Sequence, residues 1–116
     1  MTKPKRGEVW NINFDPAKGR EIRKVRPAVV ISSDRLGVLP VKLVVPITGW
    51  NESYAGKIWI VRIEKTSSNG LDKTSAAETL QTRTVASERF LSKKGVLEND
   101  ILEQIVAALA LLIEYS

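Results

Sequence analysis

Acid–base or phosphate chemistry in this chain would have to use arginine, lysine, aspartate, glutamate, serine, threonine or tyrosine, because its 116 residues include neither cysteine nor histidine. The composition excludes disulfides, thiol nucleophiles, zinc sites built from cysteine and histidine, and a histidine acid or base. Among the remaining side chains, Arg26 and Thr48 each lie at one end of a short apolar run, at the edge of the expected core. One is a cation and the other carries a hydroxyl group.

Two runs rich in β-branched residues should place Arg26 and Thr48 side by side. Residues 24–32 and 41–48 each fit a buried strand, and the loop-forming residues between them predict a hairpin. If residues whose numbers sum to 74 lie opposite each other, Arg26 faces Thr48 and their Cβ atoms are about 4.5–5.5 Å apart. A slip of one residue would turn one of the two side chains to the other face of the sheet.

A basic loop precedes Arg26. Residues 17–24 connect two strands that we expect to be neighbours, so the loop should hang over the end of the sheet from which Arg26 emerges. Its basic side chains are Lys18, Arg20, Arg23 and Lys24. They could steer a phosphate chain, or they could simply form a solvated charged loop. For Arg26 the structural alternative is an ion pair with Glu8 or Glu21.

The positive charge of the chain is displaced from its C-terminus. The net charge of +5 divides into +5 for residues 1–26, +4 for residues 27–97 and −4 for residues 98–116. A basic excess of this kind is typical of proteins that bind a polyanion, although a basic domain without such a partner fits it equally well. The sequence has no apolar signal segment, and the apolar stretch 101–113 is too short to span a bilayer, so we expect a cytoplasmic protein.

Hydrophobic periodicity predicts a mainly β chain with a C-terminal helix. Alternation predicts strands over residues 8–14 and 57–63 besides the hairpin. A long polar strand with poor alternation is expected over residues 74–85, and a short closing strand over residues 95–97. A capping pattern at Asp100 and Glu103 starts a helix that is apolar on nearly every side. These elements favour a small, strongly bent antiparallel barrel in a single domain, residues 1–116. So apolar a helix needs a second contact surface, which predicts a homodimer.

Two tryptophans have different surroundings. Trp10 shares its predicted strand face with Ile12 and Phe14, which favours a core position over a base-stacking one. Trp50 and Tyr54 lie in a loop without apolar periodicity to bury them. A single-stranded base stacked there would contribute about 1–3 kcal/mol. Alternatively, Trp50 folds back as a lid on the end of the barrel, and the sequence favours neither arrangement.

Several of these segments, taken in order, resemble the MazF/PemK family of toxins. The matching pieces are Arg6-Gly7-Glu8-Val9-Trp10, Asp15-Pro16, Gly19, Val25–Ser32, Pro46-Ile47-Thr48 and Gln81–Val85. The resemblance covers about residues 6–90 and implies an SH3-like small barrel, the fold that the CcdB toxin also has. It implies a sequence-specific endoribonuclease, independent of metal, cofactor and ribosome. Such an enzyme cuts single-stranded mRNA to a 2′,3′-cyclic phosphate and a 5′-OH, as the toxin of a toxin–antitoxin module.

The resemblance also implies roles for individual residues. Arg26 would stabilise the phosphate and transfer protons, and Thr48 would donate its hydroxyl to the phosphate. Together with the loop cations and Trp50 considered above, this gives the residues expected to bind RNA: Lys18, Arg20, Arg23, Lys24, Ser32, Trp50, Gln81 and Arg83. PemK-type members have an aspartate where this chain has Leu80, and a first-loop histidine that this chain lacks. The pattern is therefore closer to the MazF-type arrangement, with Glu78 as a substitute acid–base candidate.

The implied partners are single-stranded RNA, a MazE-like acidic antitoxin and a second copy of the chain. Operator DNA would be contacted only as part of the antitoxin complex, and no membrane is expected. One alternative is a CcdB-like toxin that binds a topoisomerase and has no RNase activity. It would act mainly through C-terminal helix residues, whereas this C-terminus is apolar and acidic. Another is an inactive nucleic-acid-binding module.

Overall fold

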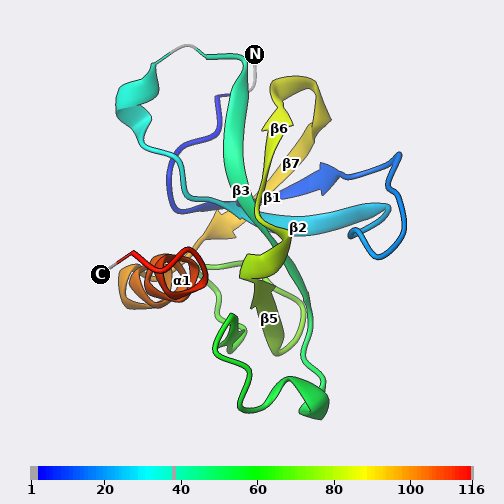
Figure 1. Cartoon of the computed structure of the whole chain (residues 1–116). Coiled ribbons are helices and arrows are strands. Elements are labelled where there is room, and N and C mark those ends of the chain that lie inside the picture. Colours follow the sequence, from blue (N-terminus) through cyan, green and yellow to red (C-terminus); the bar gives the residue numbers. More distant parts are fainter. Residues whose placement is uncertain (1–2, 38, 116) are drawn as a thin grey trace.

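The computed structural model describes residues 3–37 and 39–115, whose strands form one bent antiparallel sheet with a single long helix beside it (Figure 1). The strands are β1 (Glu8–Asn13), β2 (Val25–Val30), β3 (Val41–Gly49), β4 (Ile60–Ile63), β5 (Ser75–Glu78), β6 (Arg83–Ala86) and β7 (Phe90–Val96), and the helix is α1 (Asn99–Leu112). Short 3-10 turns lie between them: η1 (Asp34–Leu36), η2 (Glu52–Tyr54), η3 (Thr79–Gln81) and η4 (Ser87–Arg89). The mainly β fold with a C-terminal helix is thereby confirmed.

β3 organises the sheet because it pairs with three other strands. It pairs with β2 on one edge, and on the other edge first with β6 and then with β5. The full order is β4-β5-β3-β2-β1-β7, with β6 beside the first half of β3. The β1–β7 ladder shifts register twice, and such bulges bend a sheet. The sheet has the shape of a small barrel, although the ladders of the described strands do not close into a ring.

Two prolines explain why β3 changes partners where it does. Alternate N–H groups of the β2 chain face β3, as Ile31 shows by donating to the Leu43 carbonyl oxygen at 2.9 Å. By that alternation Pro27 presents its missing N–H to β3, so the β2–β3 ladder cannot continue past it. Pro46 lies between the last residue of β3 that pairs with β6 and the first that pairs with β5, so its missing N–H interrupts neither ladder. β2 and β3 therefore separate at this end of the sheet.

The sheet is buried on both faces. One face packs against α1 through a core of Val9, Val29, Ile31, Val45, Ile47, Val61, Ile63, Leu71, Ala77, Leu97, Leu102, Ile105 and Ala108. The other face carries a smaller cluster of Ile12, Phe14, Ala28, Val30, Val44, Val85 and Phe90. Trp10 packs against this second cluster as predicted, with its ring centroid 5.9 Å from that of Phe90. The second cluster does not extend to Arg26 and Thr48, at the end of this face where β2 and β3 separate.

Three predicted strands differ from the structure. The stretch 57–63 is a strand only from Ile60 on, as β4. The stretch 74–85 is not one strand but β5, η3 and β6. Thr79 still continues the β4–β5 ladder, since its N–H and its Oγ1 donate to the carbonyl oxygen of Trp59 at 3.2 and 2.5 Å. The chain then turns in η3, which Thr82 closes by donating its N–H and its Oγ1 to the Thr79 carbonyl oxygen at 3.1 and 2.6 Å. The closing strand is the seven-residue β7 rather than the short segment 95–97.

α1 begins one residue before the predicted Asp100. Its N-cap residue is Glu98, whose carboxylate makes no capping bond but accepts from Thr66 Oγ1 at 2.6 Å and from Asn69 Nδ2 at 3.4 Å. The Thr66 hydrogen bond, aided by that from Asn69, lowers the pKa of Glu98 although burial acts in the opposite direction. The carboxylate thus ties the start of the helix to the β4–β5 loop. No helix within residues 3–37 and 39–115 is long and apolar enough to cross a membrane.

Candidate active site

Thr48 holds the most unusual polar atom in the described part of the chain. It lies on β3 opposite Ala76 of β5, where β3 has already left β2. Its Oγ1 is buried without a hydrogen-bond partner, and no other buried side-chain nitrogen or oxygen in residues 3–37 and 39–115 shares that state. An unpaired buried hydroxyl costs about 1–3 kcal/mol. A bound oxygen that accepts from Thr48 would remove this cost, so the position is a candidate for ligand contact.

Arg26 is exposed and makes no ion pair with any residue that the structure describes. The ion pairs considered as structural alternatives are not formed. Glu8 pairs instead with Lys93 at 3.0 Å, and Glu21 accepts the backbone N–H of Lys18 at 2.7 Å. The guanidinium group is therefore available to an anion.

Arg26 and Thr48 project from the same face of the sheet. The predicted hairpin register is confirmed, because the residue numbers of each β2–β3 pair sum to 74, beginning with Ala28 and Pro46. Arg26 and Thr48 each lie two residues beyond that pair, so their side chains share its face. They do not form a ladder pair themselves, since β3 has by then joined β5. A cation on one strand and a hydroxyl on the other can together contact one phosphate group.

Glu78 brings a carboxylate to this face. It lies two residues after Ala76, which is opposite Thr48, so the Cα atoms of Glu78 and Thr48 are diagonal neighbours about 7–8 Å apart. Burial raises the pKa of Glu78, and the positive charge of Lys57 offsets part of the rise. A carboxylate with a raised pKa is a stronger base than an exposed one, which suits it to accept a proton.

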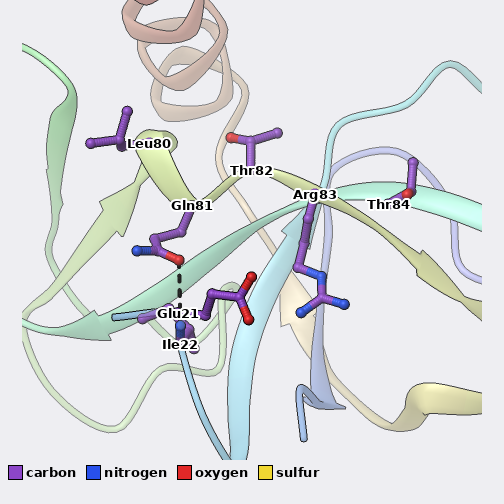
Figure 2. Close-up of a pocket in the computed structure, with 7 residues that line it drawn as sticks. All are labelled: Glu21, Ile22, Leu80, Gln81, Thr82, Arg83 and Thr84. Atoms are coloured by element: carbon purple, nitrogen blue, oxygen red, sulfur yellow. Dashed lines mark hydrogen bonds between the residues drawn. The ribbon is translucent and has the colours of Figure 1, made fainter. Parts of the chain in front are cut away.

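The loop between β1 and β2 is fixed by side chains at its base and in its middle. Asp15 Oδ1 accepts the backbone N–H of Lys24 at 3.0 Å. Gln81 of η3 accepts from the N–H of Ile22 at 3.3 Å (Figure 2). It also donates to the Arg20 carbonyl oxygen at 3.2 Å. The four basic residues predicted to bind RNA are all exposed on this loop: Lys18, Arg20, Arg23 and Lys24. Gln81 therefore positions the basic loop beside the start of β2.

A pocket of about 440 Å³ lies between this loop and the segment that enters β6 (Figure 2). Its lining residues are Glu21, Ile22, Leu80, Gln81, Thr82, Arg83 and Thr84. Gln81 and Arg83 point towards the loop, whereas Leu80 and Thr82 point away from it. The Arg83 guanidinium lies 5.8 Å from the centroid of the Phe14 ring. Arg83 thus adds a second cation to the face that carries Arg26.

Two predicted RNA-binding residues have other surroundings. Ser32 follows the end of β2 that is remote from Arg26, is buried, and uses its Oγ to accept a backbone N–H of the β3 segment at 3.2 Å. Its hydroxyl is part of the hairpin, so the structure does not bring Ser32 to Thr48. Trp50 follows β3 directly, donates from Nε1 to Glu52 at 3.3 Å, and belongs to neither core cluster. It lies beside Thr48 in the chain and is half-buried.

Two cations near this face are not evident from the sequence. Lys57 acts on the pKa of Glu78, and Arg62 of β4 lies opposite Ala76, in the same cross-strand row as Thr48. Alternation along residues 57–63 separates Arg62 from the core residues of β4. The sequence contains no signal, however, that β5 lies between β4 and β3 and so completes the row.

Gln81→Ala should release the basic loop while leaving the sheet folded, because the substitution removes both side-chain bonds to the loop backbone. Each such bond contributes about 1 kcal/mol, so trypsin should cut after Arg20 and Arg23 about ten to thirty times faster. Leu80→Ala is the matched control, since Leu80 is exposed and points away from the loop. Equal cutting rates in the two variants would show that Gln81 does not hold the loop.

The chain matches the family model of PemK-like, MazF-like toxins of type II toxin–antitoxin systems over residues 5–113. It is 34% identical over 114 residues to endoribonuclease MazF9 of Mycobacterium tuberculosis, a match that covers 92% of this chain and 93% of that protein. It is 40% identical over 53 residues to the probable endoribonuclease MazF1 of the same species, covering 40% of this chain and 57% of that protein.

Solved structures agree in fold. MazF from Deinococcus radiodurans superposes with a TM-score of 0.80 at 21% identity, covering 98% of this chain and 99% of that chain. An endoribonuclease from a mycobacterial species, solved in complex with its cognate antitoxin, superposes with a TM-score of 0.77 at 16% identity, covering 98% of each chain. The likeness to these structures shows the fold. With the family match and the curated relative, it shows that this chain belongs to the PemK-like, MazF-like toxin family of type II toxin–antitoxin systems.

Proposed function

We propose that the endoribonuclease activity of this toxin is a metal-independent, ribosome-independent and sequence-specific cleavage of single-stranded mRNA that leaves a 2′,3′-cyclic phosphate and a 5′-OH. The observation that carries the proposal is the buried, unpaired hydroxyl of Thr48 on the face that also carries the unpaired guanidinium of Arg26. The endoribonuclease names of the curated relatives favour this reading over a topoisomerase-binding toxin.

Glu78 is the proposed general base. Cleavage requires removal of the proton from the ribose 2′-OH as its oxygen attacks the adjacent phosphorus. The carboxylate of Glu78 is raised in pKa by burial and stands diagonally across from Thr48. No histidine is available for this step, so a carboxylate made more basic by its surroundings takes its place.

Arg26 and Thr48 stabilise the charge that develops on the phosphorane oxygens. The Thr48 hydroxyl turns to donate to one of these oxygens, and in doing so acquires the hydrogen bond that it lacks in the free protein. Arg26 donates to another and delivers a proton to the leaving 5′ oxygen, a role that fits a group protonated at any physiological pH. The new bond joins the 2′ oxygen to phosphorus, and the bond to the 5′ oxygen breaks.

The basic loop guides the RNA backbone into this face. Its four exposed cations lie beside Arg26, and neutralisation of phosphates by such cations releases counterions and strengthens binding. The substrate is single-stranded because only an unpaired strand can bring its ribose and phosphate to a site built on a sheet face. The toxin acts in the cytoplasm, where mRNA is found.

The proposed inhibitor is an acidic, MazE-like antitoxin. Several solved neighbours are complexes of MazF with MazE or of an endoribonuclease with its cognate antitoxin. In this chain the exposed cations of the basic loop lie beside Arg26, so an acidic segment would be drawn to the same face as RNA. Operator DNA would be bound only through the antitoxin.

Thr48→Val should abolish cleavage and leave the melting temperature unchanged or higher, because it removes a hydroxyl that is buried without a partner. Arg26→Gln should lower kcat by about 10²–10³-fold, as the loss of one transition-state donor does, with no change in stability since Arg26 is exposed. Discrete cuts in a long unstructured RNA, made in EDTA and mapped by their ends, provide the measurement. Arg35→Gln, an exposed arginine in η1, is the control.

Glu78 should set the acidic limb of the pH–rate profile. The base must be deprotonated, so cleavage should fall as the pH falls through its pKa, and this fall should begin at a higher pH than for an ordinary carboxylate. Lys57→Gln should move the limb to higher pH, because the charge of Lys57 partly offsets the rise in the pKa of Glu78. Glu78→Gln should reduce the rate and flatten the limb. If the acidic limb lies at the same pH in both variants as in the wild type, a residue other than Glu78 is the base.

The toxin is further proposed to be a homodimer through α1. Leu102, Ile105 and Ala108 face the core, which leaves Leu111 at 59% exposure on the outer side of the helix. Leu111→Glu should therefore shift the protein to monomers in sedimentation at micromolar concentration. Leu91→Glu, at a β7 residue with 55% exposure, is the control. A monomeric wild type, or a Leu111→Glu dimer, would exclude α1 from the interface.

A further inference from the structure

An aromatic cluster lies beyond the end of β3, outside both cores. The Trp50 and Tyr54 rings meet edge to face, with centroids 5.8 Å apart. Trp59 is the third ring, and the Lys57 ammonium lies 5.9 Å from the ring centroids of both Tyr54 and Trp59. All three rings are half-buried, and none belongs to a core cluster. Large aromatic surface gathered in this way, away from any core, is typical of a binding surface.

Arg62 extends this cluster with a second flat surface. Its guanidinium lies 4.9 Å from the centroid of the Trp50 ring. Its Nε donates to Glu64 at 3.0 Å, while its two terminal nitrogens have no hydrogen-bond partner among the described residues. A guanidinium held over an indole ring in this way offers a planar group for a nucleobase and free donors for a phosphate.

The cluster is continuous with the proposed cleavage site. Arg62 lies opposite Ala76, and Ala76 lies opposite Thr48, so the Cα atoms of Arg62 and Thr48 are two strand spacings, about 10 Å, apart. Lys57 connects the same two regions, because its charge acts on Glu78. An RNA strand whose phosphate contacts Thr48 therefore has a neighbouring nucleotide within reach of the cluster.

We infer that Trp50, Tyr54, Trp59 and Arg62 form a stacking subsite for an unpaired nucleobase close to the scissile phosphate, with Arg62 also contacting the RNA backbone. The inference rests on the proposed ribonuclease function and adds to it a residue set that fixes where the strand lies. Stacking on aromatic rings tolerates any base, so this subsite contributes affinity and position rather than base identity.

The test pairs protein variants with abasic RNA. An oligonucleotide spanning one mapped cut is made with each base removed in turn. For the wild type, KM should rise about fivefold or more at one position within a few nucleotides of the cut, with kcat changed less than twofold. Trp50→Leu should raise KM for the intact RNA by a similar factor and make that position insensitive to base removal. Arg62→Gln, at an exposed residue, repeats the test without risk to folding.

Ile58→Gln is the matched control, because Ile58 is exposed in the same loop and belongs to no ring contact. A second measurement uses a 2′-O-methyl RNA of random sequence, which lacks the attacking hydroxyl and reports binding whether or not the protein cleaves. Arg62→Gln and Trp50→Leu should each weaken this binding about fivefold or more. Unchanged binding of this RNA in both variants would overturn the subsite. If the wild type binds the 2′-O-methyl RNA but does not cleave unmodified RNA, only the ribonuclease function is overturned.

Discussion

The geometry of the site follows from the backbone N–H group that Pro27 lacks. β2 and β3 can pair only where alternate N–H groups of β2 reach across, and Pro27 ends that series. β3 then leaves β2 and takes β5 as its neighbour, with Pro46 at the changeover. This single change of partner leaves Arg26 exposed on β2. It also places Ala76 and, through β4, Arg62 in one cross-strand row with Thr48, with Glu78 diagonally across from Thr48.

The same change of partner accounts for the chemistry of a chain without histidine. Residue type alone supplies only an arginine that stays protonated, a threonine and ordinary carboxylates. The fold alters two of these by burial: it raises the pKa of Glu78, and it holds the Thr48 hydroxyl without a partner. Both states cost stability in the free protein, and in the proposed reaction both would be relieved by bound RNA and by transfer of the proton.

The sequence is informative where a single strand or hairpin decides the outcome. Alternation and turn residues place the hairpin in its correct register, with Arg26 and Thr48 on one face. They do not show that Thr79, where the polar stretch leaves β5, is anchored by its hydroxyl to the carbonyl oxygen of Trp59, twenty residues away. Nor do they show that the amide of Gln81 is occupied by the backbone of the basic loop. These missed features depend on which segments are neighbours in space, and the periodicity of a single strand does not predict its neighbours.

Gln81 and the basic loop illustrate how the proposed roles in affinity and in chemistry are separated in this fold. The groups proposed for the chemistry lie on strands, where backbone ladders and two cores fix them. The cations proposed to steer phosphates lie on a loop that two hydrogen bonds to the neutral side chain of Gln81 connect to η3. Such bonds contribute about 1 kcal/mol each, far less than the sheet. A polyanion can therefore rearrange the loop and leave Arg26, Thr48 and Glu78 in place. An acidic antitoxin and RNA would then compete for a movable cationic surface over a fixed catalytic one.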